Sequence, residues 1–394
     1  MRPGFSLWPH PRLVRGWRGL AAVGGRIGKP LFLVVVAAVL VGVADSPSRG
    51  STAAGLIAFM RPPPSQDTYI YPCRGTVYTI QADAADLKAV GEGGCPDWSR
   101  DGTRLAVAAA RGIFVIDASG GSRRQLTRNP APNARGGDAY PVWSPDGKKI
   151  AFIRIRYGFN GPSVIYVVPA NGGRLTKVAV TYGDIGSNAD LSFGPVSWSP
   201  NSRRIAYARC VAPSGRSISV GCRLETVGAD GRGRRKGPPI ESRPDWSPIG
   251  PEIAVVQEIG YHDVLRLVRD GVKGGRRLIS CGCLQPKWSP DGHQLAFADA
   301  DGRLIIVSSG GGQVRRLTGP VTGLFDEFAW SPDGREIAFI RWTETVIYDS
   351  PGWRQFAAQV EIARTDGSGT RTIDSGPNAD RNVVWRPSMA AANR

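Results

Sequence analysis

One short phrase, Trp-Ser-Pro-Asp-Gly, recurs along the chain and constrains its fold more than any other feature. Proline sets φ for the first corner of a tight turn, aspartate caps the backbone, and glycine takes the position with positive φ. An apolar stretch such as Ile150–Phe152 follows every copy except the last. Each copy therefore predicts two antiparallel strands joined by a tight turn. The phrase, complete or altered, begins at Trp98, Trp143, Trp198, Trp246, Trp288, Trp330 and Trp385.

The copies are spaced at a regular long period. Successive tryptophans lie 45, 55, 48, 42, 42 and 55 residues apart. Each interval holds four strand-like pieces, of which the Trp phrase ends the first. A strand-rich repeat of this period is typical of a β-propeller, which is an all-β ring of four-stranded blades. We expect seven blades, with six as the fallback if one degenerate unit forms no blade.

The two ends of the repeat complement each other. The first unit, starting near Gly55, lacks a Trp strand, and the last Trp strand, Val383–Trp385, lacks a following unit. Pairing of Val383–Trp385 with Leu56–Phe59 would build one blade from both chain ends and leave no open sheet edge. We therefore expect the propeller to span residues 55–388, after a linker at 47–54 and before a short tail at 389–394.

The repeat resembles that of the TolB-type β-propeller family. Trp143–Gly147, Ile150–Phe152 and Ile165–Val168 match the family's phrases in order and spacing, and the resemblance covers about residues 55–387. The family includes an envelope protein that binds a peptidoglycan-associated lipoprotein, and propeller domains that precede serine peptidases. The resemblance thus implies a fold and two different kinds of function. This chain departs from the envelope protein, whose propeller has six blades and follows a separate α/β domain.

The N-terminus has the features of an export address. Residues 1–29 carry six basic and no acidic side chains, and Leu31–Ala44, within segment 30–46, is an apolar run of 14 residues. A membrane-spanning helix needs about 20 residues, so the run fits the apolar region of an export signal better. The long basic leader favours an uncleaved signal-anchor over a cleaved signal peptide. Both place residues from about 50 onward outside the cytoplasm.

The charge of the chain suggests anionic partners. The formal net charge is +17, and without the leader 44 basic and 33 acidic residues leave +11. Such a balance favours nucleic acid, anionic lipid or acidic polymers. The sequence holds no RNA-recognition signature, zinc knuckle or recognition helix. Nucleic acid is therefore not an expected partner.

Basic residues recur in phase with the repeat on one side of the expected ring. In a four-stranded meander, the turns after the first and third strands share one side, which we call the Trp-turn face. The series has two interpretations. It could face an anionic membrane beside the tether. We prefer the second interpretation, in which the charges prevent the outermost strands from pairing with strands of other molecules. The members of the series are Lys148, Lys149, Arg203, Arg204, Arg234, Arg235, Arg276, Arg277, Arg315 and Arg316.

The other side, the long-loop face, carries the longer connections. Aromatic residues lie among acidic ones there, and this combination is typical of recognition surfaces. We expect this face to bind a protein or a cell-envelope polymer. The candidate binding residues are Asp138, Tyr140, Tyr157, Phe159, Tyr182, Asp184, Asp190, His262, Phe325, Asp326, Glu327, Trp342 and Trp353.

Cysteines predict a cross-linked domain. Cys210 and Cys222 should face each other across a hairpin stem and form a disulfide, and Cys73 and Cys95 are a second candidate pair within one blade. Cys281-Gly282-Cys283 leaves two options, a strained bridge or a metal clip for which no further ligands are evident.

Catalytic signatures are scarce. The propeller holds two histidines, His262 and His293, and there is no Gly-x-Ser-x-Gly elbow or phosphate-binding loop. We therefore expect a monomeric binding scaffold without a cofactor. Two alternatives remain open. One is a sensor domain of an envelope signalling system. The other is a lyase or hydrolase of sugars or lactones, whose funnel would hold Ca²⁺ through Asp184, Asp190, Asp326 and Glu327.

Overall fold

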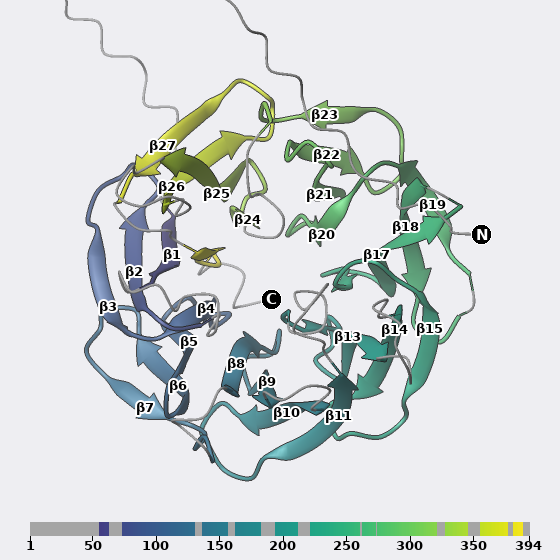
Figure 1. Cartoon of the computed structure of the whole chain (residues 1–394). Coiled ribbons are helices and arrows are strands. Elements are labelled where there is room, and N and C mark those ends of the chain that lie inside the picture. The colour runs from purple at the N-terminus through teal and green to yellow at the C-terminus, as the bar shows by residue number, and fades with distance from the viewer. Residues whose placement is uncertain are drawn as a thin grey trace, which may run out of the picture. The chain divides into compact units, whose positions relative to one another are not determined.

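Seven four-stranded antiparallel sheets surround a central axis in the computed structural model (Figure 1). It describes residues 55–62, 73–130, 136–156, 162–182, 194–211, 221–260, 262–272, 274–320, 328–345, 355–376 and 381–388. Within these ranges all regular structure is β-strand apart from turns. The prediction of a seven-bladed propeller is confirmed, and the six-bladed fallback is not needed.

Each blade is a meander whose first strand lies nearest the axis (Figure 1). The strands of blades 1 to 4, from the inside outward, are as follows: β28 (Arg381–Trp385), β1 (Leu56–Arg61), β2 (Thr76–Gln81), β3 (Lys88–Glu92); β4 (Gly94–Trp98), β5 (Arg104–Ala109), β6 (Gly112–Asp117), β7 (Arg123–Gln125); β8 (Gly136–Trp143), β9 (Lys149–Arg156), β10 (Pro162–Pro169), β11 (Thr176–Tyr182); β12 (Ser197–Trp198), β13 (Arg204–Val211), β14 (Gly221–Gly228), β15 (Arg235–Pro239).

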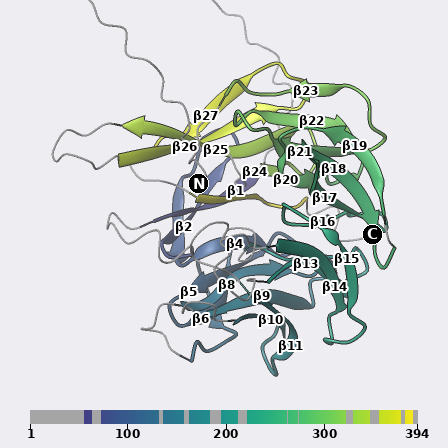
Figure 2. The ribbon, with the colours of Figure 1, turned by 45° about the vertical axis from the view of Figure 1, so that its right-hand side comes forward.

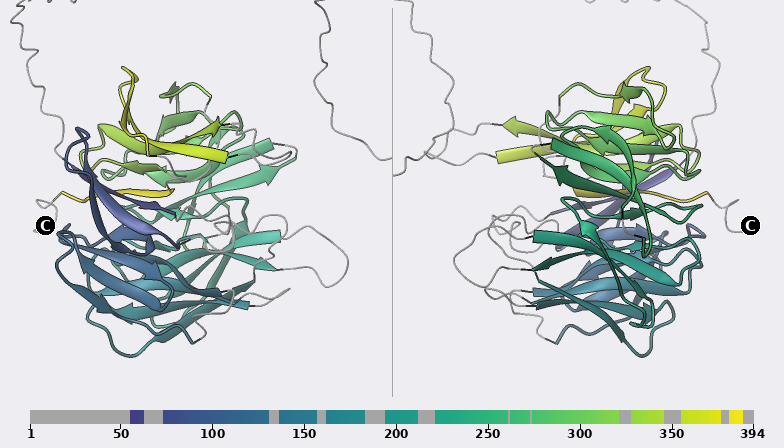
Figure 3. Two further views of the ribbon diagram at one scale, coloured as in Figure 1. Left: turned by 60° about the vertical axis from the view of Figure 1, so that its left-hand side comes forward. Right: turned by 90° about the vertical axis from the view of Figure 1, so that its right-hand side faces the viewer.

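Blades 5 to 7 continue the ring in the same order. Their strands are β16 (Asp245–Trp246), β17 (Glu252–Ile259), β18 (His262–Arg269), β19 (Arg276–Ser280); β20 (Leu284–Trp288), β21 (Gln294–Ala298), β22 (Leu304–Ser308), β23 (Val314–Arg316); β24 (Phe328–Trp330), β25 (Glu336–Thr345), β26 (Gln355–Arg364), β27 (Thr370–Asp374). The long hairpin of β25 and β26 projects from the ring on the long-loop face (Figures 2 and 3).

Both chain ends meet in blade 1, as predicted. Ile57 pairs with Trp385 and Ala58 with Val384, so β28 from the C-terminal end forms the inner edge of a sheet that otherwise comes from the N-terminal end. The ring is therefore closed by backbone hydrogen bonds.

Local hydrogen bonds explain why the repeated phrase forms a turn. The Ser144 hydroxyl donates to Asp146 Oδ1 at 2.6 Å, and the same oxygen accepts the Lys148 N–H at 3.0 Å. The Lys149 N–H donates to Ser144 Oγ at 2.9 Å, and Gly147 has a φ of 67° that favours glycine. Trp143 is buried against the neighbouring blade. Serine and aspartate thus fix the turn, while tryptophan anchors it.

The core lies between blades, not within them. On β1, Ile57 and Phe59 pack with Ile340 and Val360 of blade 7, whereas Ala58 packs with residues of blade 2. Both sides of the second strand are therefore buried, and this explains why the Ile-Ala-Phe phrases read as continuous apolar runs.

Basic side chains on several outermost strands reach the following blade. Each donates to a carbonyl in the turn between that blade's third and fourth strands. The contacts are Lys88 to Ser119 O at 2.8 Å, Arg124 to Ala170 O at 3.1 Å, Arg276 to Gly310 O at 3.2 Å, Arg315 to Thr365 O at 2.7 Å, and Arg371 to Ala82 O at 3.3 Å. Part of the basic series therefore joins neighbouring blades, a use that neither sequence interpretation included.

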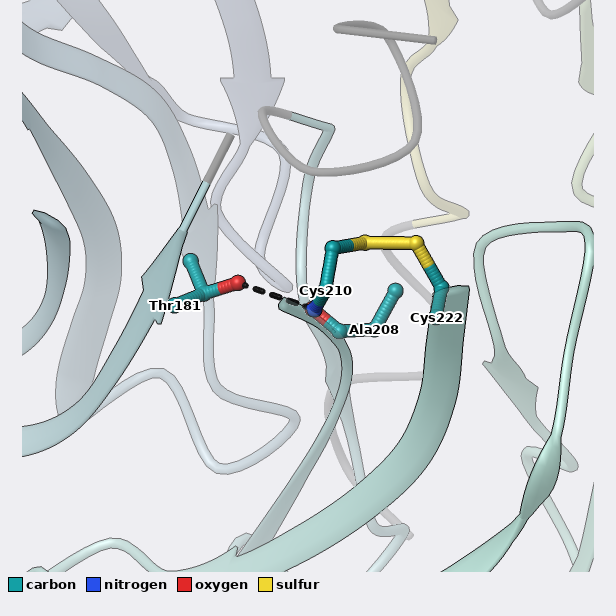
Figure 4. Close-up of a disulfide and its surroundings, with 4 residues drawn as sticks. All are labelled: Thr181, Ala208, Cys210 and Cys222. Atoms are coloured by element: carbon teal, nitrogen blue, oxygen red, sulfur yellow. Dashed lines mark hydrogen bonds between the residues drawn. A yellow bond between two sulfur atoms is a disulfide. The ribbon is translucent and has the colours of Figure 1, made fainter. Parts of the chain in front are cut away.

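Both predicted disulfides are formed. Cys210 and Cys222 link β13 to β14, where they are direct partners in register with Cα atoms 4.0 Å apart. Thr181 of blade 3 donates to Ala208 O and accepts the Cys210 N–H beside this bond (Figure 4). Cys73 and Cys95 also pair, but the expectation that they share one blade was wrong, since Cys95 lies in β4 of blade 2. Cys281 and Cys283 form a third pair.

The expected export segment lies outside the described residues. Among the residues that the structure describes, no helix is long and apolar enough to cross a membrane.

Candidate functional site

A groove on the long-loop face lies between blades 1 and 2. There β5 and β6 are joined by residues 110–111 alone, because Ala109 pairs with Gly112. β5 and β6 have six residues each, whereas β9 and β10 of the neighbouring blade 3 have eight each. The hollow has a volume of about 500 Å³. We call it the blade 2 groove, and its lining is Arg61, Pro62, Arg74, Gly75, Thr76, Tyr78, Glu92, Gly93, Ala109 and Ala110.

One part of the groove lining, on the side of blade 1 that faces blade 7, is an arginine–tyrosine stack. The Arg61 guanidinium lies 4.8 Å from the centre of the Tyr78 ring, and that ring stacks on Phe59 at 5.9 Å. Arg61 also forms an ion pair with Asp374 of blade 7. These contacts hold the Tyr78 ring in place, and fixed aromatic rings bind sugars and peptides at low entropic cost.

A disulfide holds the segment next to that part of the lining. Cys73 directly precedes Arg74 and is bonded to Cys95 of β4, with Cα atoms 5.0 Å apart. Gly94 packs so closely that a Cβ there would lie 2.6 Å from the Cys73 carbonyl oxygen. Only glycine permits this approach. The start of β2 is thereby fixed to the inner strand of blade 2.

The groove continues toward blade 3 over a buried ion pair. A second hollow shares Arg74, Ala109 and Ala110 and is also lined by Asp138. The Asp138 carboxylate is fully buried and accepts from Arg154 Nε at 2.6 Å and from Thr127 Oγ1 at 2.5 Å. The hydrogen bond to Asp138 raises the pKa of Arg154. Asp138, which the sequence suggested as a surface recognition residue, therefore supports the groove from below.

The other predicted binding residues are scattered. Tyr140 is half-buried in β8 with a φ of 51°, and His262 is exposed at the start of β18. Trp342 is half-buried, with the Arg381 guanidinium 5.1 Å from its ring centre. Tyr182 ends β11, and its side chain is not among those described. The predicted positions outside the described residues are Tyr157, Phe159, Asp184, Asp190, Phe325, Asp326, Glu327 and Trp353.

Some members of the predicted basic series are exposed, and others form ion pairs or contacts between blades. Lys148, Arg203, Arg277 and Arg316 are exposed, and Lys149 is half-buried. Arg204 and Arg235 form ion pairs with Asp270, and Arg234 lies 3.8 Å from the buried Glu225 carboxylate. Arg276 and Arg315 form the interblade contacts described above.

Three charged residues near the axis were missed by the sequence reasoning. Asp97, Asp245 and Lys287 each directly precede the Trp of a first strand. Asp97 accepts the Trp143 N–H at 2.7 Å, Asp245 accepts the Trp288 N–H at 2.8 Å, and Lys287 donates to Phe328 O at 2.6 Å. Each side chain thus joins its own inner strand to the next. The sequence does mark these three residues, because the position before the Trp is uncharged in the other blades. Its occupants there are Val142, Ser197, Ala329 and Val384.

The environment of the two carboxylates makes them unusually basic. Desolvation raises the pKa of Asp97 to about 7 and that of Asp245 to about 6, against the opposing effects of their backbone hydrogen bonds and of Lys287. Such values suit proton transfer near neutral pH. Within the described ranges, no group of three His, Cys, Asp or Glu side chains is placed to hold a metal ion. The suggested Ca²⁺ ligands lie outside those ranges.

Comparisons with known proteins support the fold. No family model matches the chain. Dipeptidyl-peptidase 5 of Porphyromonas gingivalis is 28% identical over 127 residues, which are 29% of this chain and only 17% of that protein. TolB from Acinetobacter baumannii is 16% identical, with a TM-score of 0.52 over 85% of this chain and 67% of that one.

A further solved structure, oligogalacturonate lyase in complex with manganese, is 15% identical, with a TM-score of 0.53 over 74% of this chain and 82% of that one. The protein is a seven-bladed β-propeller whose fold is similar to that of TolB. Its structural neighbours include TolB, a lyase and peptidases, so the fold does not decide between binding and catalysis.

Proposed function

We propose that this protein is a binding scaffold outside the cytoplasm that holds a protein segment or a cell-envelope polymer in the blade 2 groove. The observation that carries the proposal is the groove itself. It combines a fixed aromatic ring, Tyr78, with charged side chains of both signs, Arg74 and Glu92, around a hollow of about 500 Å³. Pockets of this size with a few oriented polar groups are the usual sites of ligand recognition.

The cross-links support the proposed location. Disulfides persist in oxidising compartments and are rare in the cytosol. All six cysteines of this chain are paired. Together with the apolar segment at 30–46, this favours a propeller that is tethered to the outer side of the cytoplasmic membrane, or secreted after cleavage, and works as a monomer.

Site-specific photo-crosslinking in the native cell tests the proposal. A photoreactive residue at Ala110 lies in the groove, and one at Ala300 lies in the corresponding turn of blade 6, where that residue is exposed. We expect a discrete adduct from position 110 that position 300 does not give. Equal labelling from both positions, or from neither, would contradict binding in the groove.

A second candidate function is catalysis near the central axis. Asp97 and Asp245, with pKa values near neutrality beside Lys287, favour it. In this candidate the protein is a lyase or hydrolase whose carboxylates transfer protons. Asp245→Asn would abolish turnover of an oligosaccharide or lactone substrate while leaving the photo-adduct at position 110 unchanged. Metal analysis of the purified protein adds a second readout, since a stoichiometric ion would favour the enzyme.

A further inference from the structure

Most of the exposed large apolar side chains lie on the Trp-turn face. Among the described residues, the exposed large hydrophobic ones are Leu87 at 45%, Ile249 at 62%, Ile259 at 47% and Val272 at 54%. All but Ile259 lie on the Trp-turn face, because they occupy turns that follow a first or a third strand. Ile249 and Val272 belong to the two such turns of blade 5. Blade 5 therefore exposes two large apolar side chains on this face.

Ile249 replaces the aspartate of the Trp-Ser-Pro-Asp-Gly phrase in blade 5. It occupies the position that Asp146 holds in blade 3, and the blade 5 turn still closes because the Gly250 N–H donates to Ser247 Oγ at 3.2 Å. The side chain lies across Gly292 of blade 6, where an added Cβ would be 2.4 Å from Ile249 Cγ1. The isoleucine therefore stands at the tip of the face, and nothing in the turn itself requires an apolar residue there.

Exposed basic side chains lie on the same face as these apolar residues, although the turn that holds Leu87 carries the exposed Asp83 and Asp86 instead. Exposed cations lie in or directly beside the turns of this face in blades 2, 3, 4, 5 and 7. Several aspartates of the face are engaged: Asp146, Asp291 and Asp333 cap their own turns, and Asp270 pairs with Arg204 and Arg235. Surfaces that bind anionic bilayers typically combine exposed apolar side chains with basic ones. The exposed cations include Arg100, Lys148, Arg174, Arg203, Arg232, Arg269, Arg335 and Arg364.

The chain enters the propeller on the same face. β1 starts at Leu56 as a second strand, and second strands run from the Trp-turn face to the long-loop face. The apolar run ends at Ala44, and the intervening residues span at most about 40 Å when fully extended. An anchor in that run would keep the Trp-turn face within this distance of the membrane.

We propose that the Trp-turn face docks on an anionic phospholipid bilayer, with Ile249 and Val272 in the headgroup layer and the surrounding cations on lipid phosphates. The blade 2 groove then points away from the membrane. This inference extends the proposed tethering, and it holds whether or not the groove takes the proposed ligand.

Vesicle sedimentation tests the proposal with residues 50–394, which form one compact unit whose two ends pair within blade 1. We expect binding to phosphatidylglycerol-rich vesicles at low salt, its loss at high salt, and no binding to phosphatidylcholine vesicles. Equal binding to both vesicles, or none to the anionic ones, would overturn the proposal. Ala110→Trp should bind vesicles normally, which separates this test from that of the groove.

Matched variants locate the contact. The pair Lys148→Gln and Arg203→Gln should weaken partition to anionic vesicles about 25-fold, at roughly fivefold for each cation. The pair Arg111→Gln and Arg128→Gln changes the same charge on the long-loop face and should have little effect. An equal loss in both pairs would overturn the assignment of the face.

The apolar contribution needs its own comparison. Ile249→Ser should weaken vesicle binding several-fold, whereas Ile259→Ser, on the long-loop face, should not. Binding that requires the cations but is unchanged by Ile249→Ser and Val272→Ser would indicate a site for a soluble polyanion, and would overturn the bilayer as the partner.

Discussion

The buried carboxylate of Asp97 makes the stability of the protein depend on pH. Asp97 accepts a backbone hydrogen bond from the next blade, and desolvation raises its pKa to about 7. A folded-state pKa above the unfolded value of 3.8 means that the folded protein binds this proton more tightly. The stabilisation is complete below pH 3.8 and is lost as the pH rises through about 7.

Asp97→Asn should therefore flatten this pH dependence. Asparagine keeps an oxygen to accept the Trp143 N–H without burying a charge. We expect the variant to exceed the wild type in unfolding free energy at pH 8, and to lose that advantage near pH 4. The effect is of the order of 4 kcal/mol, since one pKa unit corresponds to about 1.4 kcal/mol. Urea unfolding at several pH values measures it.

Asp101→Asn is the control with the opposite sign. Burial acts to raise the pKa of Asp101, but hydrogen bonds from Ser99 and Thr103 outweigh it and lower that pKa. This variant should be less stable than the wild type above pH 4. Parallel pH profiles for the Asp97 and Asp101 variants would contradict the assignment.

Individual residues were harder to predict than the elements that hold them. The turn phrase identified Asp146 and Gly147 as turn formers, and the structure agrees, whereas the part of Ser144 in the turn was seen only in the structure. Asp138 was misjudged, because its burial depends on Arg154 from the adjacent strand and on Thr127 from another blade. Such contacts arise only when separate strands meet, and no local pattern records them.

At the scale of elements, a short hairpin connection and a cross-link border the groove. The β5–β6 connection beside the groove is two residues long, a feature visible in the short interval between Val107 and Ile113. The β17–β18 connection of blade 5 is equally short, so connection length alone could not predict where the hollow lies. The Cys73–Cys95 bond was foreseen, but its role in joining two blades was not.

Replacing both Cys73 and Cys95 with serine should loosen the groove wall. Disulfides typically contribute about 2–4 kcal/mol, so we expect a loss of that order in the unfolding free energy. The photo-adduct from position 110 should also fall. Serines at Cys210 and Cys222, which lie within one hairpin of blade 4, should leave the adduct unchanged. Equal loss of adduct in both double variants would contradict a local role for Cys73–Cys95.

At the scale of the molecule, closure of the ring was the most predictable feature. The unpaired halves at Leu56–Phe59 and Val383–Trp385 could be counted from the phrases, and the register of β28 with β1 confirms the count. The repeated phrases could not predict which surface features the two faces carry, because these depend on loop lengths and on contacts between blades.

Removal of residues 381–394 should open the ring. β1 would then expose an unpaired edge, and blade 1 would lose the buried Val383 and Trp385. We expect a large drop in thermal midpoint, together with aggregation. Removal of residues 389–394 alone, which leaves β28 complete, should have little effect. A stable, monomeric product of the longer truncation would show that closure contributes little.

In the proposed arrangement, the Trp-turn face docks on a bilayer and the blade 2 groove points away from it. The central claim is that the groove holds the ligand. The most direct measurement is native mass spectrometry, with glycan and peptide analysis, of full-length protein purified from its own envelope. Ala110→Trp fills the groove and should remove the bound component, whereas Ala300→Trp should retain it. Retention by both variants, or loss from both, would contradict the claim.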